Sequence, residues 1–166
     1  MSAAMSTPAM PLAPMTVADL DAVVGIEQQA YPFPWSRGNF VDSLAAGYMA
    51  EVLLEARGHV IGYYVAMHGV QETHLLNLTV APGQWSQGHG RQLLGRVVDR
   101  AQILHSQTLW LEVRESNARA RAVYQRYGFV QVGTRRGYYP APQGQREDAM
   151  VMSLALTSSG ASHGMD

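Results

Sequence analysis

The stretch LNLTVAPGQWSQGHGR, residues 76–91, decides the fold. Apolar residues alternate with polar ones up to Val80, a loop with several glycines follows, and helical spacing of apolar residues begins near Gly88. A strand that runs through such a loop into a helix directs free backbone N–H groups and the positive end of the helix dipole at one point, which favours a bound phosphate. The Gly88-His-Gly90 pattern alone is equally compatible with a tight start of the helix.

Two common phosphate sites are excluded by the residues present. The chain has no lysine, which a Walker loop requires. Leu93 occupies the position where a dinucleotide fingerprint needs its third glycine.

Periodicity on both sides of this stretch predicts a single α/β domain. We expect helices at residues 16–30, 36–47, 88–105 and 117–127, and strands at 48–56, 60–67, 75–80, 108–113, 129–132 and 149–156. Two of the helices each connect strands, which predicts a mixed sheet with parallel crossovers in its middle. The domain then spans 15–156, between a flexible lead-in at 1–14 and a flexible tail at 157–166.

Composition excludes several classes of protein. A chain of 166 residues with 47% hydrophobic residues can bury the core of one domain. The absence of cysteine excludes disulfides, thiolate zinc sites and a cysteine nucleophile. The six histidines lack paired ligand spacing, so we expect no metal. With no apolar run of membrane-spanning length and no signal peptide, we expect a soluble cytoplasmic protein that contacts no membrane.

Charge is divided along the chain. Residues 1–90 hold two arginines and seven acidic residues, a net charge of −5, whereas residues 91–146 hold ten arginines and three acidic residues, a net charge of +7. The second half therefore favours an anionic ligand and the first a cationic one, although a mixed solvated surface gives the same numbers. Because the arginine-rich half lacks an aromatic-interleaved motif, we expect no nucleic-acid binding.

Two side chains near the second central strand suggest chemistry. By alternation, Glu112 shares a face with Trp110 and opposes Leu109, Leu111 and Val113. A carboxylate in so apolar a strand faces a cleft, has a raised pKa or forms an ion pair with Arg114 or another arginine. Tyr124 lies one turn before the end of the next helix, where a tyrosine commonly belongs to the core with its hydroxyl bonded to the backbone.

Taken together, these segments resemble the GCN5-related N-acetyltransferases (GNAT). The resemblance rests on Gly88-His-Gly-Arg91, Leu109-Trp-Leu-Glu-Val-Arg114, Asn117 and Ala122-Val-Tyr-Gln-Arg-Tyr-Gly-Phe129. More narrowly, the ribosomal-protein-alanine acetyltransferases of the RimI type are similar at Glu27, Tyr31-Pro-Phe-Pro-Trp-Ser36, Asn77-Leu-Thr-Val80 and Arg135-Arg-Gly-Tyr-Tyr-Pro140. The resemblance covers about residues 16–156.

The resemblance implies acetyl-CoA as the acetyl donor and a sheet splayed between the strands that end at Val80 and Val113. It implies Glu112 as proton acceptor and Tyr124 as proton donor. The positions that match coenzyme contacts are Leu78, Thr79, Val80, Ser86, Gln87, Gly88, His89, Gly90, Arg91 and Asn117. Those that match the acceptor groove are Glu27, Phe33, Trp35, Tyr138 and Tyr139. One departure is Trp85, which stands where the family usually has Gln or Arg.

The implied reaction is acetyl transfer to the N-terminal amine of a protein, in this family the N-terminal alanine of a small-subunit ribosomal protein. A lysine amine, with a pKa of about 10.4, is harder to deprotonate than an α-amine of about 7.7–8.0, which favours the N-terminus. Two alternatives stay open: a GNAT enzyme that acetylates a small amine or a protein lysine, and a non-catalytic CoA-binding module.

Overall fold

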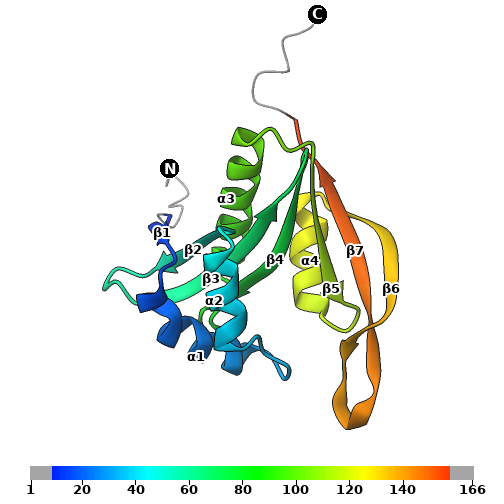
Figure 1. Ribbon diagram of the computed structural model, residues 1–166, viewed down its shortest axis with the longest axis horizontal. Coiled ribbons are helices and arrows are strands. Elements are labelled where there is room, and N and C mark those ends of the chain that lie inside the picture. The colour runs from blue at the N-terminus through cyan, green and yellow to red at the C-terminus, as the bar shows by residue number, and fades with distance from the viewer. Residues whose placement is uncertain (1–8, 158–166) are drawn as a thin grey trace, which may run out of the picture.

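A seven-stranded mixed sheet in the order β1-β2-β3-β4-β5-β7-β6 runs through the centre of the protein, as Figure 1 shows. This is a computed structural model that describes residues 9–157; the predicted tail, beyond Thr157, and the first eight residues lie outside that range. The strands are β1 (Leu12–Pro14), β2 (Met49–Leu54), β3 (Val60–His68), β4 (Glu72–Val80), β5 (Thr108–Arg114), β6 (Val130–Pro140) and β7 (Arg146–Ala155). The predicted mixed α/β fold is confirmed.

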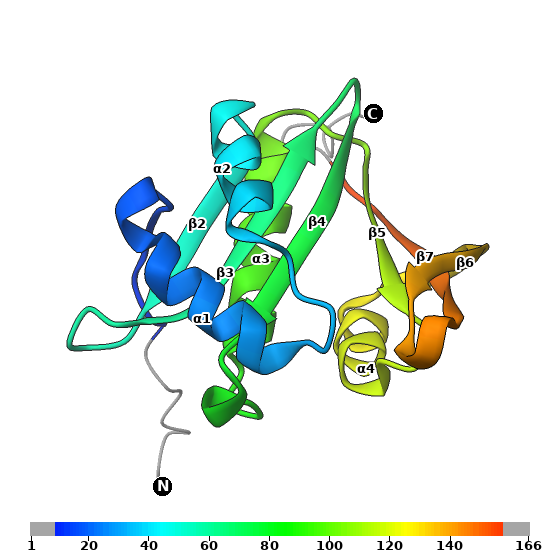
Figure 2. The ribbon, with the colours of Figure 1, turned by 60° about the horizontal axis from the view of Figure 1, so that its bottom comes forward.

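Four α-helices cover the sheet on its two faces (Figure 2). They are α1 (Leu20–Ala30), α2 (Arg37–Ala45), α3 (His89–Ile103) and α4 (Ala118–Tyr127). Helices α1 and α2 pack on one face in a core cluster with Phe40 and Tyr63, while α3 and Tyr124 of α4 share the core of the other. None of the helices in residues 9–157 is long and apolar enough to cross a membrane.

The helix ends follow the capping residues that the sequence predicts. Thr16 and Asp19 form a capping box before α1, through a short 3-10 turn at Val17–Asp19. The Ser36 hydroxyl accepts from the Asn39 amide at 3.1 Å and begins α2. Asn117 accepts from the Ala120 amide at 3.1 Å and begins α4, which stops at Gly128 with φ of 120°. Local side-chain chemistry therefore sets these boundaries.

Besides shifts of a few residues at the ends of elements, three details differ from the prediction. Leu12–Pro14, placed in the flexible lead-in, forms strand β1 against β2. Strand β6 extends to Pro140 rather than Val132. The sequence pattern missed its second part because register shifts in the pairing with β7 break the alternation of side chains that marks a strand. In α2, helical periodicity predicts Val41 on the inward face with Phe40 and Leu44, but Val41 is 40% exposed and Ser43 is buried.

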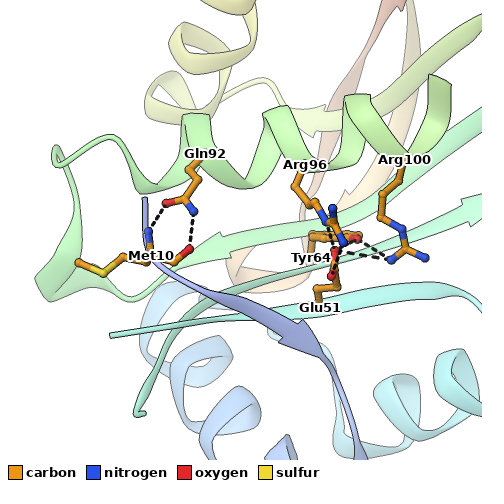
Figure 3. Close-up of polar contacts among 6 residues, drawn as sticks. All are labelled: Met10, Glu51, Tyr64, Gln92, Arg96 and Arg100. Atoms are coloured by element: carbon orange, nitrogen blue, oxygen red, sulfur yellow. Dashed lines mark hydrogen bonds and ion pairs between the residues drawn. The ribbon is translucent and has the colours of Figure 1, made fainter. Parts of the chain in front are cut away.

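Helix α3 is fixed to the sheet by a buried carboxylate on β2 (Figure 3). Glu51, 4% exposed, accepts two hydrogen bonds from Arg96 at 2.8 and 3.1 Å and one from the Tyr64 hydroxyl at 2.5 Å. Arg100 donates to the same hydroxyl at 3.0 Å. One turn before Arg96, Gln92 exchanges two hydrogen bonds with the Met10 backbone, which holds the chain ahead of β1 against α3.

The sheet opens between β4 and β5, its only parallel neighbours in the described chain. The two strands pair from Glu72↔Thr108 to Leu75↔Leu111 and then separate. The separation begins at Leu76, an extra residue in β4 at the register shift between Val65 and Ala66 of β3. Because a bulge bends and twists its strand, it turns the end of β4 away from β5. The splayed sheet that the resemblance implies is confirmed (Figure 2).

Candidate active site

The free end of β4 presents backbone polar groups to the opening. The Ala81 amide donates to Ile61 of β3 at 2.8 Å, so by strand alternation the N–H and C=O of Val80 point away from β3. The Val80 carbonyl accordingly accepts from the Trp85 indole at 2.9 Å. Thr79 points its side chain into the interior and is 2% exposed. The Val80 N–H is thus directed toward the space between the two strands.

The loop between β4 and α3 gathers free amides at the start of α3. Ser86 and Gly88 adopt positive φ of 66° and 83°, which turns the backbone toward the helix. In the described chain, the amides of residues 86–91 donate no hydrogen bond to another group. Four of these residues, Gln87, Gly88, His89 and Arg91, line a pocket of about 580 Å³ together with Tyr127 and Ala9. This is the geometry of an anion site at a helix N-terminus.

Trp85 joins the two sides of the opening. Its indole N–H holds the Val80 carbonyl, and the Arg119 guanidinium of α4 lies 3.9 Å from the centre of its ring. Asn117, two residues before Arg119, uses its side-chain oxygen to cap α4. The residue that departs from the family pattern therefore offers Arg119 an aromatic face, which a Gln or Arg lacks.

Glu112 lies beside the opening with both carboxylate oxygens occupied. His74 Nε2 is 2.7 Å from Oε1, and Arg135 Nε is 2.8 Å from Oε2; the side chain is 8% exposed. Arg114, the neighbour that the sequence offered as an ion-pair partner, bonds to Glu147 at 3.0 Å instead. Sequence reasoning did not assign His74, because its partner lies 38 residues away.

The Tyr124 side chain is buried, but its hydroxyl makes no hydrogen bond within the described residues. Tyr124 is 7% exposed and its ring packs 5.5 Å from Phe129. No side-chain or backbone group of residues 9–157 hydrogen-bonds its hydroxyl, in contrast to a core tyrosine tied to the backbone. Burial raises the pKa of Tyr124, and the nearby hydroxyls of Tyr31 and Tyr139 raise it further. The hydroxyl therefore stays protonated and lies near tyrosines from both sides of the opening.

A buried hydrogen-bond network supports the free end of β4. Glu27, 2% exposed, accepts from the Tyr63 hydroxyl at 2.6 Å, from Asn77 at 3.1 Å and from the Trp35 amide at 3.0 Å. The Thr79 hydroxyl lies 2.7 Å from both Asn77 Oδ1 and the Tyr31 hydroxyl. Burial raises the pKa of Tyr31 to about 12. Glu27 thus holds α1, the loop after it and β4 together from within.

Arginine and aromatic side chains meet between β6 and the loop after α1. The Arg114 guanidinium lies 4.5 Å from the Tyr139 ring centre and 5.3 Å from that of Phe33, so it links β6 to the loop after α1. Tyr138 and Tyr139 pack edge to face at 4.9 Å. Trp35 lies apart from this group, with its ring 5.1 Å from Phe40. The structure brings together Phe33, Tyr138 and Tyr139, and it places Glu27 and Trp35 behind them.

A sheet opened between two central strands, with an amide-lined pocket at the next helix and a carboxylate and a free phenol at the opening, defines an acyltransferase of the N-acetyltransferase class. Residues 20–129 match the model of the acetyltransferase (GNAT) family, and the chain belongs to this family. GNAT acetyltransferases use acetyl-CoA.

Within the family, the chain is similar to enzymes named [ribosomal protein bS18]-alanine N-acetyltransferase. It is 39% identical over 139 residues to the enzyme of Escherichia coli K12, covering 84% of this chain and 93% of the relative. It is 36% identical over 138 residues to that of Haemophilus ducreyi, covering 83% and 94%.

The fold agrees with the sequence comparison. The crystal structure of the ribosomal-protein-S18-alanine N-acetyltransferase from E. coli superposes with a TM-score of 0.82 at 35% identity, over 93% of this chain and 99% of the other. A phosphinothricin acetyltransferase from Sinorhizobium meliloti in complex with AcCoA, 20% identical, shares the fold with a TM-score of 0.75.

Proposed function

We propose that this protein transfers the acetyl group of acetyl-CoA to the N-terminal alanine of a small-subunit ribosomal protein, bS18. The observation that carries the proposal is the opening between β4 and β5, bordered by the Glu112 carboxylate and the free Tyr124 hydroxyl. The relatives named for this reaction match 83–84% of the chain, and the family match at residues 20–129 includes both residues.

The residues present fit acetyl-CoA. Its pyrophosphate suits the free amides of Ser86, Gln87, Gly88, His89, Gly90 and Arg91, where the positive end of α3 favours an anion. The edge of β4 that does not pair with β5 includes Leu78, Thr79 and Val80, and an extended pantetheine would lie along it. Asn117, at the start of α4, borders this edge. Arg91 adds a cation at the pocket. Acetyl-CoA supplies the electrophile, a thioester carbonyl.

Proton transfer falls to two residues. Each oxygen of Glu112 retains acceptor capacity beyond its bond to His74 or Arg135, so the carboxylate takes a proton from the attacking amine, directly or through one water. Tyr124, whose pKa is raised by burial, donates a proton to the departing sulfur. The Val80 N–H stabilises negative charge that develops on the carbonyl oxygen.

The acceptor peptide lies against Phe33, Tyr138 and Tyr139. Phe33 and Tyr138 are 40% and 44% exposed, which leaves aromatic surface for a peptide chain. Glu27 and Trp35 act behind this surface, since Glu27 bonds the Trp35 amide and so positions the loop that carries Phe33.

Thiol release from acetyl-CoA with two cationic peptides tests the proposal. One peptide has a free N-terminal alanine and no lysine; the other has a blocked N-terminus and one internal lysine. We expect rapid release with the first alone. Release with the second peptide alone would identify a lysine acetyltransferase. No release with either peptide would indicate an enzyme that acetylates a small amine, or a protein without catalytic activity. Peptides that begin with Ser, Met and Pro then test alanine preference, and equal rates for all four contradict it.

A further inference from the structure

The histidine beside the proposed proton acceptor has no part in the reaction as described so far. His74 lies on β4 within the last paired segment before the opening, directly opposite Trp110 of β5. Its Nε2 is 2.7 Å from Glu112 Oε1, across the two strands. This contact is built by the sheet register, because Glu112 is two residues beyond Trp110 and shares its face.

The orientation of the His74 ring is fixed by stacking. Its ring lies 3.6 Å from that of Trp110 with an angle of 8° between the planes. The side chain is 13% exposed, so it has little freedom to leave this position. An aromatic pair with this overlap holds the imidazole edge, and therefore Nε2, toward the carboxylate.

The direction of the hydrogen bond follows from the second partner of Glu112. Arg135 Nε forms an ion pair with Oε2 at 2.8 Å. An ionised carboxylate only accepts, so Nε2–H is the donor. Oε1 is hydrogen-bonded to His74 and Oε2 is in an ion pair with Arg135, so the plane of the carboxylate is set. The acceptor amine approaches the lone pairs that remain.

We propose that His74 is a positioning residue for Glu112: its Nε2–H donates to Oε1 and holds the carboxylate in the orientation that accepts the amine proton. This inference rests on the proposed function, in which Glu112 is the base. When that proton binds a free lone pair of Glu112, the N–H bond of the amine breaks, and the His74 hydrogen bond persists to the neutral acid.

Two substitutions separate the hydrogen bond from the stacking. His74→Phe keeps an aromatic ring on Trp110 and removes the donor, whereas His74→Gln keeps an N–H donor of similar reach and removes the ring. We expect His74→Phe to lower kcat about tenfold with KM for acetyl-CoA unchanged, as loss of a hydrogen bond to a charged group predicts. We expect His74→Gln to stay within about threefold of the parent kcat.

Three comparisons complete the experiment. His59→Phe, at an exposed turn, is the matched control and keeps the parent kcat; His74→Met replaces His74→Phe if the latter does not fold. In a Glu112→Gln background, we expect His74→Phe to cause no further loss of kcat, because the two residues act through one contact. Any one of three results overturns the inference. His74→Phe has the parent kcat, or His74→Gln loses as much kcat as His74→Phe does. The third is that His74→Phe lowers kcat as much in the Glu112→Gln background as in the parent. Full activity of Glu112→Gln alone instead rejects Glu112 as base.

Discussion

Glu112 and Tyr124 are held in opposite ways by their surroundings. Glu112 has a partner at each oxygen: Oε1 lies 2.7 Å from His74 Nε2, and Oε2 forms an ion pair with Arg135. Tyr124 has no partner for its hydroxyl, and burial raises its pKa. Amine acetylation requires a group that accepts a proton and a group that donates one, so a carboxylate paired with a guanidinium and a protonated phenol support the two roles.

Replacing Glu112 by Gln tests the base. We expect Glu112→Gln to lower kcat at neutral pH by about 10²–10⁴, the usual contribution of general acid–base catalysis, while the dissociation constant of acetyl-CoA stays near that of the parent. Steady-state thiol release and calorimetric titration measure the two quantities. Glu115→Gln, which removes an exposed carboxylate three residues away, serves as control. Parent turnover in Glu112→Gln contradicts the assignment.

Replacing Tyr124 by Phe tests the acid. Because the hydroxyl has no partner in residues 9–157, we expect Tyr124→Phe to keep the parent melting temperature within about 2 °C and to lower kcat about tenfold. The raised pKa keeps the hydroxyl protonated past pH 10, so loss of its proton produces no fall in kcat between pH 7 and 10. Calorimetry and a pH profile check both points, and a collapse of stability shows a core role instead.

At the scale of elements, local patterns predicted most helices and strands, because caps and apolar periodicity act within a few residues. Thr16, Ser36 and Asn117 each begin a helix as expected. Strand β1 was missed because three residues ending in Pro14 carry no alternation and depend on pairing with β2. The bulge at Leu76 and the bonds of Glu27 to residues 36 and 50 positions away arise from tertiary packing, which sequence spacing does not encode.

The link between α3 and β2 depends on Glu51. Burial raises the pKa of Glu51, but hydrogen bonds from Arg96 and Tyr64 outweigh it and hold the pKa below its usual value. A carboxyl pKa that is lower in the folded state stabilises the fold at pH values above the pKa in the unfolded chain, about 4.3. This stabilisation is lost as the pH falls through the pKa of the folded state.

We therefore expect Glu51→Gln to lower the free energy of unfolding at pH 7 by about 2 kcal/mol, since it leaves Arg96 and Arg100 without their carboxylate. The difference from the parent narrows toward pH 3. Urea unfolding at both pH values measures it. Glu72→Gln, which changes an exposed glutamate, is the control. An equal difference at both pH values contradicts the electrostatic origin.

At the scale of the whole molecule, the fold uses the uneven distribution of charge in two ways. Arg96, Arg100, Arg114 and Arg135 of the basic half pair with carboxylates of the protein itself. Arg91 lies at the pocket of about 580 Å³ and contacts the ring of Tyr127 at 5.7 Å. Four of the ten arginines of residues 91–146 thus pair with carboxylates of the fold, whereas Arg91 lines the pocket at the start of α3.

This division predicts a donor-specific salt effect. We expect Arg91→Ala to raise KM for acetyl-CoA about fivefold at low salt with kcat unchanged, because the guanidinium attracts the coenzyme phosphates. The difference shrinks in 1 M salt, where the Debye length falls from about 10 Å at 0.1 M to about 3 Å. With acetyl-pantetheine, which lacks the phosphates, KM is the same for Arg91→Ala and the parent. Arg57→Ala removes the same charge from an exposed turn and changes neither KM. A rise in KM for both donors would show that Arg91 shapes the pocket rather than binding phosphate.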